Sequence, residues 1–77
     1  MSIVKMPHGY KFRKEDVLLL LRERKEVAKK GHYTRMLREI EYLQKKIRHK
    51  RGVIDLSKDE VAKRWLNIFR FWLRPVS

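Results

Sequence analysis

The chain has 77 residues, which allows one domain and no more, because a separate core needs roughly 50 to 200 residues. Lys and Arg number 21 against 9 Asp and Glu, a formal net charge of +12, and hydrophobic residues make up 43% of the chain. That apolar share excludes a disordered basic tail, and the small size argues against a deep enclosed substrate pocket.

Cysteine is absent, which excludes disulfides, thiolate metal sites and cysteine nucleophiles. The N-terminal residues lack the apolar stretch of a secretory signal. The longest apolar run, residues 17–21, is far shorter than the 20 or so residues of a transmembrane helix. We therefore expect an intracellular, cytoplasmic protein. The low Asn and Gln content and the many Lys, Arg and Glu residues are typical of proteins from thermophiles.

Residues 1–13 carry no helical period and are interpreted as a basic and aromatic N-terminal arm. If the arm is extended, its period of two places Tyr10 and Phe12 toward the protein and Lys11 and Arg13 toward water. The remaining residues, 14–77, are expected to form a single three-helix domain.

The first helix is predicted over residues 14–30, with acidic residues in its first turn, lysines in its last and Gly31 at the C′ position. The second is predicted from Thr34, as N-cap, to about Arg51, before Gly52. Its apolar residues recur at i, i+4, i+7 and i+11, the clearest amphipathic pattern in the chain. They are Met36, Ile40, Leu43 and Ile47.

The third helix is predicted to begin at a capping box formed by Ser57 and Glu60 and to end near Leu73, before Pro75. The pattern therefore favours an all-α fold of three helices with a basic N-terminal arm. The alternative is a winged-helix-like α+β fold, in which residues 2–6 pair with residues 52–56 as two short antiparallel strands.

Residues 56–64 resemble the opening helix of helix-turn-helix domains, through the capping box and a common apolar period. The turn and the recognition helix of such domains do not follow, because residues 67–73 continue the same helix. No function is transferred from this resemblance.

No catalytic or metal-binding constellation is visible. The three histidines have no second His or carboxylate at metal-ligand spacing, and the helix dipole explains the carboxylates near the predicted helix starts. Motifs for phosphate loops, dinucleotide binding and nucleophile elbows are missing. We expect a non-enzymatic protein without a cofactor, a metal or a small-molecule substrate.

Basic residues gather in the predicted second helix. Residues 44–51 hold five formal positive charges, and no acid lies between Glu41 and Asp55. A ridge of guanidinium and ammonium groups matches a phosphate backbone, although cations are also favoured near any helix C-terminus. Further basic residues lie in the arm and beside it. The candidate nucleic-acid-binding residues are Lys11, Arg13, Lys14, Arg35, Arg38, Lys45, Lys46, Arg48, His49, Lys50 and Arg51.

The predicted third helix is unusually apolar. Its apolar residues span roughly 200° of the helical wheel, against about 100° for an ordinary surface helix, and two neighbouring helices can hardly cover that arc. Part of the arc is therefore expected at an interface with another chain, the alternatives being the core and an anionic membrane surface. The candidate interface residues are Trp65, Leu66, Phe69, Phe71, Trp72 and Leu73.

These features predict a small basic protein that contacts the backbone of RNA or DNA electrostatically. It would act as a subunit of a larger assembly, either ribonucleoprotein or ribosome-associated, or as a dimeric DNA-binding protein, joined through the third helix. The alternative is a non-enzymatic protein-interaction module, an adaptor or inhibitor that uses the aromatic face of the third helix and whose charge meets an acidic protein. Nucleic-acid binding needs the cations of the second helix and the arm on one continuous surface.

Overall fold

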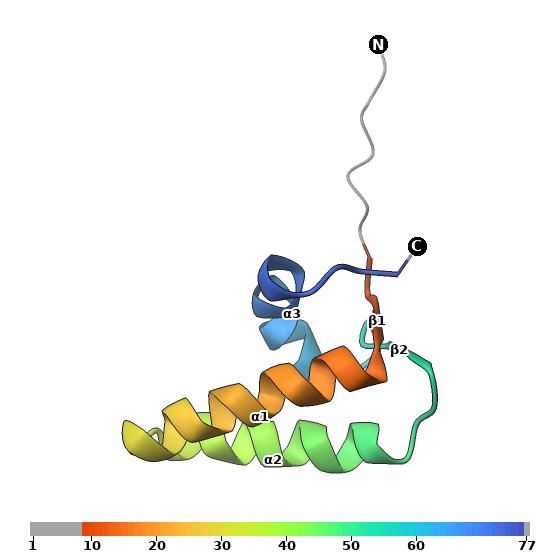
Figure 1. Cartoon of the computed structure of the whole chain (residues 1–77). Helices are drawn as coiled ribbons and strands as arrows, with labels where there is room; N and C mark the ends of the chain where they lie inside the picture. The colour runs from red at the N-terminus through yellow and green to blue at the C-terminus, as the bar shows by residue number, and fades with distance from the viewer. Residues whose placement is uncertain (1–8, 77) are drawn as a thin grey trace.

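The computed structural model describes residues 9–76, and these form three helices and two short strands. In chain order the elements are β1 (Lys11–Arg13), α1 (Lys14–Lys30), α2 (Thr34–Arg48), β2 (Val53–Asp55) and α3 (Glu60–Trp72). α1 and α2 run antiparallel as a long hairpin, and α3 lies across the end of it where the two strands pair (Figure 1).

The protein is mostly helical with a small two-stranded antiparallel sheet, which confirms the three predicted helices. β2 lies inside the predicted strand 52–56, but its partner is Lys11–Arg13, while the expected partner, residues 2–6, lies outside the described residues. In the sheet Phe12 is opposite Ile54, and both side chains are fully buried. The outward positions beside Phe12 carry Lys11 and Arg13, as a period of two requires.

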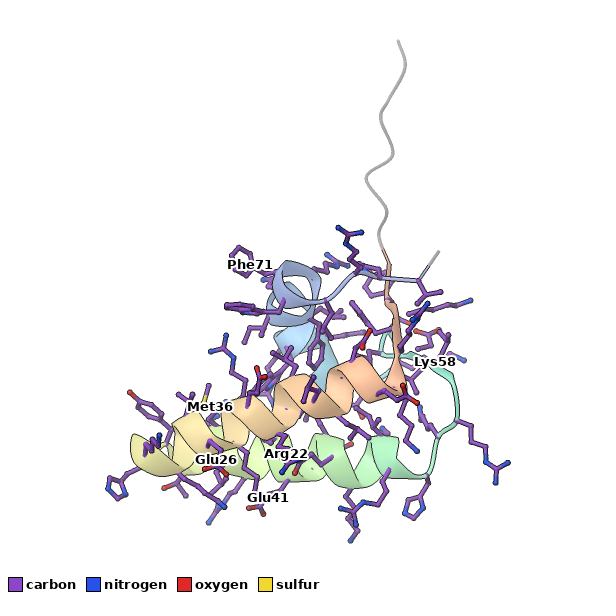
Figure 2. The ribbon with its side chains drawn as sticks, in the orientation of Figure 1. Arg22, Glu26, Met36, Glu41, Lys58 and Phe71 are labelled. Carbon is purple, nitrogen blue, oxygen red and sulfur yellow. The ribbon has the colours of Figure 1, made fainter. Side chains whose placement is uncertain are left out.

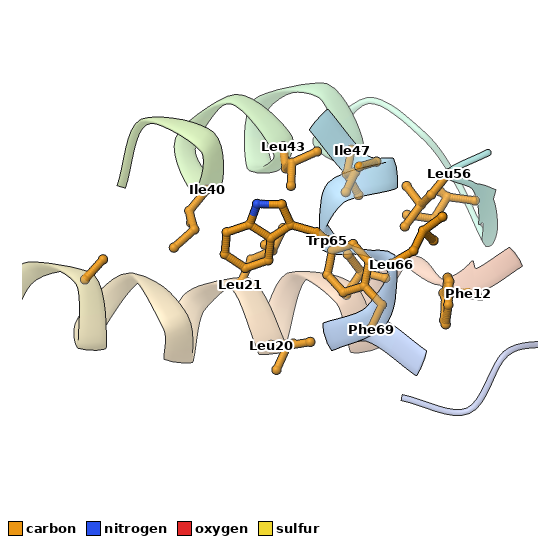
Figure 3. Close-up of a cluster of buried hydrophobic side chains, with 14 residues drawn as sticks. Phe12, Leu20, Leu21, Ile40, Leu43, Ile47, Leu56, Trp65, Leu66 and Phe69 are labelled. Atoms are coloured by element: carbon orange, nitrogen blue, oxygen red, sulfur yellow. The ribbon is translucent and has the colours of Figure 1, made fainter. Parts of the chain in front are cut away.

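The hydrophobic core is formed by one face of each helix together with the buried side of the sheet (Figure 3). Phe69 of α3 is its centre, with ring centroids 5.8 Å from Phe12 and 6.1 Å from Trp65. Burying a large apolar side chain contributes roughly 1.5–3 kcal/mol, so this cluster supplies much of the stability of a small domain. The fully or nearly buried apolar residues are Phe12, Val17, Leu20, Leu21, Ala28, Ile40, Leu43, Ile47, Ile54, Leu56, Ala62, Trp65, Leu66 and Phe69.

The end of α1 differs from the expected glycine cap. Gly31 is right-handed, with φ −89°, and His32 adopts the left-handed conformation, with φ 56°. The Tyr33 amide donates to the Ala28 carbonyl at 2.9 Å, a Schellman-type closure with His32 at C′. A Cβ at Gly31 would lie 2.3 Å from the ring of Tyr33, so a larger residue there would force this exposed ring to move.

Two predicted N-caps are wrong. Thr34 is the first residue of α2 rather than its cap, and Tyr33 before it makes no side-chain cap bond. α3 is capped by Asp59, whose Oδ1 accepts from the amides of Val61 and Ala62 at 2.9 and 3.0 Å. Ser57, expected as that cap, instead donates through its hydroxyl to Asp55 Oδ1 at 2.6 Å.

α2 ends at Arg48, earlier than predicted, and residues 49–52 form the connection to β2 with Gly52 at φ +67°. After α3 the chain becomes extended at Leu73, and the Val76 amide donates to the Lys11 carbonyl at 2.7 Å. The C-terminal segment therefore lies beside β1. No helix of residues 9–76 has the length and apolarity needed to cross a membrane.

Candidate nucleic-acid interface

The structure brings most of the predicted cations to the end of the molecule that holds the sheet. The Lys14 amide donates to the Gly52 carbonyl at 2.9 Å, and Lys14 Nζ donates to the Arg48 carbonyl at 2.7 Å. These bonds join the start of α1 to the end of α2. Arg35 and Arg38 lie in the first half of α2, and Lys45 and Lys46 lie in its last turn. The basic residues at the sheet end are Lys11, Arg13, Lys14, Arg48, His49, Lys50 and Arg51.

Lys46 has a structural partner. Its ammonium bonds Asp59 Oδ2, which also accepts from the Tyr42 hydroxyl at 2.9 Å. Desolvation raises the pKa of Asp59, but hydrogen bonds from Lys46, the Ala62 amide and Tyr42 outweigh it and lower the pKa to about 2. The hydrogen bond to Asp59 likewise raises the pKa of Lys46. This cluster ties α2 to the start of α3, so the charge of Lys46 is neutralised within the fold.

Arg35 is also paired, through Glu39. Arg64 of α3 approaches one oxygen of Glu39 at 3.0 Å and Arg35 approaches it at 3.9 Å. The indole N–H of Trp65 donates to the other oxygen at 2.9 Å. Glu39 thus holds α3 against α2 and neutralises part of the charge of the two guanidinium groups.

These residues border a hollow of about 580 Å³ between the first half of α2 and the middle of α3, which we call the apolar hollow. Met36, Trp65 and Ile68 contribute its apolar walls, and Arg35 and Arg64 its charged ones. It is lined by Tyr33, Thr34, Arg35, Met36, Glu39, Arg64, Trp65 and Ile68.

A second hollow, of about 400 Å³, lies between α1 and α2, and we call it the basic hollow. It is lined by Leu18, Arg22, Lys25, Glu26, Lys29, Gln44 and Arg48. Its lining holds four cations and a single carboxylate. Figure 2 shows Arg22 and Glu26 of α1 and Glu41 of α2 where the two helices run side by side.

The cations of the basic hollow differ from the paired ones described above. The ion pairs found in residues 9–76 engage Arg35, Lys46, Lys63 and Arg64, and none of these lines the basic hollow. Arg22 and Lys25 were not singled out from the sequence. With Leu18 and Lys29 they follow the spacing i, i+4, i+7 and i+11, so their shared face of α1 is visible in the sequence.

Two further hollows extend this surface around the start of α1. One, of about 260 Å³, is lined by Arg13, Lys14, Glu15, Gly52 and Val53. The other, of about 580 Å³, is lined by Arg13, Asp16, Trp72, Leu73, Arg74, Pro75 and Val76. Arg13 belongs to both, and the bond from Lys14 to Arg48 joins the first of them to the basic hollow. The resulting line of cations, which we call the basic path, consists of Lys29, Lys25, Arg22, Arg48, Lys14, Arg13 and Arg74.

The expected aromatic interface of α3 is divided by the fold. Trp65, Leu66 and Phe69 are in the core, because the sheet adds Phe12, Ile54 and Leu56 to the two helices and so covers more of the arc than expected. Leu73 is partly buried. Phe71 and Trp72 are 80% and 58% exposed, and their rings pack edge to face at 5.3 Å.

Comparison with protein-family models, with curated proteins and with solved structures found no match to this chain. The basic path ends beside an exposed aromatic pair, and the apolar hollow lies on the other side of α2.

Proposed function

We propose that the chain binds nucleic acid along the basic path, by neutralising backbone phosphates, and that it does so as a subunit of a larger assembly. Such an assembly is a ribonucleoprotein or ribosome-associated particle, or a dimeric DNA-binding protein. The observation that carries the proposal is the basic hollow, where four cations and one carboxylate lie together outside the ion pairs of the described fold.

Electrostatics supports a polyanionic ligand for this surface. Four cations on two adjacent helices repel one another, and the formal net charge of +12 adds to that repulsion. A phosphate backbone relieves it, and the release of condensed counterions supplies the favourable entropy. If these basic residues only kept the protein soluble, we would expect them to be interspersed with acidic residues over the surface.

The dimensions of the basic path also fit a nucleic-acid backbone. Lys14 and Lys29 stand at the two ends of α1, about 22 Å apart at 1.5 Å per residue. That length equals about six or seven nucleotides of one duplex strand, at 3.4 Å each. Contacts of this kind position a protein on RNA or DNA without reading its sequence.

The test compares two triple variants with the same loss of charge. Arg22→Gln, Lys25→Gln and Lys29→Gln change the basic hollow, whereas Arg38→Gln, Lys45→Gln and Lys63→Gln change exposed positions outside it. We expect the first variant to bind a labelled 20-base-pair duplex roughly 10- to 100-fold more weakly at low salt. The slope of log K against log salt should fall by about 0.9 for each lost phosphate contact. Fluorescence anisotropy at several salt concentrations measures both quantities.

If the two variants lost duplex affinity equally, binding would depend on the net charge of the protein and not on the basic path. Circular dichroism should show unchanged helicity in both, because all six side chains lie outside the core.

The second candidate is an interaction module for an acidic protein, and the apolar hollow favours it. Its apolar walls and its two arginines match an amphipathic segment that carries carboxylates. If the chain is part of a nucleic-acid complex, a neighbouring protein of the assembly or a second copy of the chain would contact α3 at the apolar hollow. If the wild-type chain binds neither RNA nor DNA duplex at low salt, the interaction module becomes the better explanation.

A further inference from the structure

We propose that Phe71 and Trp72 stack on an unpaired base of the nucleic acid that the basic path holds. The preferred ligand is then a strand with single-stranded nucleotides rather than a continuous duplex. This inference rests on the proposed function and specifies the class of nucleic acid that is bound.

The first observation is the exposure of the aromatic pair. Phe71 is 80% exposed and Trp72 is 58% exposed, whereas the other rings of α3, Trp65 and Phe69, are almost completely buried. Figure 2 shows Phe71 at the end of α3, pointing away from the body of the protein. Two adjacent large rings in water contribute little to this fold, and every base offers a face on which such rings can stack.

The second observation is the charge around the pair. The guanidinium of Arg24 lies 5.3 Å from the centroid of the Trp72 ring, and Arg74 follows two residues later. After Glu60 the chain carries no acidic residue. Proteins that bind single strands combine aromatic stacking with arginines that contact the backbone and the bases, and both components are present here.

The third observation is continuity with the basic path. Trp72 shares a hollow of about 580 Å³ with Arg13 and Arg74, whose lining contains one carboxylate, that of Asp16. Arg13 also lines the hollow next to Lys14, which leads to Arg48 and the basic hollow. A backbone that follows the basic path therefore arrives beside Trp72. The hollow has the volume of pockets that hold small ligands, which suits a single nucleotide.

An anionic membrane is a less suitable partner for this pair. A helix that lies in a membrane interface needs a continuous apolar face, and the apolar face of α3 is already in the core through Trp65, Leu66 and Phe69. Phe71 and Trp72 alone would enter the lipid.

The test separates stacking from general hydrophobic contact. Phe71→Leu with Trp72→Leu keeps apolar side chains but removes the aromatic faces, and Phe71→Tyr with Trp72→Phe keeps both. The ligands are a labelled strand of about 12 nucleotides, its duplex, and the same strand with abasic sites at its centre. We expect the leucine variant to bind the single strand about 5- to 150-fold more weakly, the range for loss of one stacked base. Its affinity for the duplex should change less than about 2-fold, and the aromatic variant should match the wild type.

Three results would overturn the inference: wild-type protein that binds the abasic strand as tightly as the intact one, a leucine variant that binds the intact strand normally, or equal losses for strand and duplex. Phe71→Leu alone repeats the measurement if the double variant does not fold by circular dichroism. Normal strand binding by the leucine variant, together with loss of binding to phosphatidylserine vesicles in Phe71→Ser with Trp72→Ser, would assign the pair to membranes. Failure of the wild type to bind both strand and duplex would instead contradict the proposed function.

Discussion

The two hollows beside α2 share a helix but differ in how their charges are compensated. On the side of α3, Arg35 and Arg64 approach Glu39, which also accepts from the indole of Trp65. On the side of α1, the cations of the basic hollow lie outside the ion pairs of the described fold. The basic residues therefore fall into two groups, those that form ion pairs within the fold and those of the basic hollow, which lie outside these ion pairs.

This difference follows from where α3 packs. α3 lies against the side of α2 that bears Glu39 and Tyr42, and it brings Arg64, Trp65 and the Asp59 cap into contact with them. α1 packs against α2 mainly through apolar residues, so the four cations that line the basic hollow share a single carboxylate, that of Glu26. The positions of the acidic residues, and not the net charge, therefore distinguish the two sides of α2.

The largest expected effect is a loss of stability when the contact between α3 and α2 is disrupted. Trp65→Ala deletes a side chain that is 4% exposed and leaves Glu39 without its indole donor. We expect a loss of about 3–5 kcal/mol, which is comparable to the whole stability of a domain this size, so most of the chain should unfold. Thermal unfolding followed by circular dichroism measures the loss, and Trp65→Phe, which keeps an aromatic side chain in the core but not the indole N–H, should lose less.

The same variant tests whether the basic hollow needs the fold. Trp65→Ala changes no basic residue, so an unfolded chain keeps its charge but loses the arrangement of cations between α1 and α2. Duplex binding should therefore weaken along with the helicity. Undiminished binding by the unfolded variant would show that charge alone is sufficient.

A smaller effect is expected from acid, through Asp59. Its pKa is lowered to about 2 in the folded protein, from 3.8 in the absence of its partners. The folded state stabilises the ionised carboxylate of Asp59. The contribution of this carboxylate to the free energy of unfolding is therefore present above about pH 4 and is lost as the pH falls toward 2. The shift corresponds to about 2 kcal/mol. Asp59→Asn, which can still cap α3, should remove most of this dependence in urea unfolding curves recorded from pH 5 to 2.

An unchanged acid dependence in Asp59→Asn would assign that dependence to another carboxyl group. Asp55 is the relevant comparison, because hydrogen bonds from Ser57 also lower its pKa. Asp55 is exposed and lies on the sheet, away from the contact between α2 and α3.

The helices were predictable from the sequence because their signals are local. α1 occupies the predicted range, and the buried residues of α2 belong to the predicted apolar stripe. The cap of α3 was not predictable with the same certainty, because Ser57 and Asp59 are both good N-cap residues. The outcome depends on Tyr42 and Lys46, which are distant in sequence and hold Asp59 in place.

The candidate site shows the same limit. The sequence identified two groups of basic residues, Lys11 and Arg13 in the arm and those that follow Arg48. It did not predict that the two groups lie at the same end of the molecule, because that arrangement depends on the pairing of β1 with β2. Lys46 was assigned to the ligand surface although it is bound to Asp59. The spacing of Lys25 and its neighbours shows their shared helix face, but the hollow that they line with Arg48 exists only once α1 and α2 are packed.

The smallest expected effect is a change in duplex affinity, and it tests directly whether the two hollows differ in ligand binding. Glu26→Gln and Glu39→Gln raise the net charge equally, but Glu26 lines the basic hollow and Glu39 lines the apolar one. Removing the carboxylate of Glu26 takes a repulsive charge away from a bound phosphate, so duplex affinity should rise by roughly 2- to 5-fold at low salt.

Glu39→Gln releases two guanidinium groups from their partner, yet these lie on the other side of α2 and should change affinity little. Its cost should instead fall on stability, about 1–2 kcal/mol, because Trp65 and Arg64 lose a charged acceptor. Anisotropy titrations and urea unfolding of the two variants separate these outcomes, and an equal gain in affinity would mean that the ligand responds to net charge and not to the basic path.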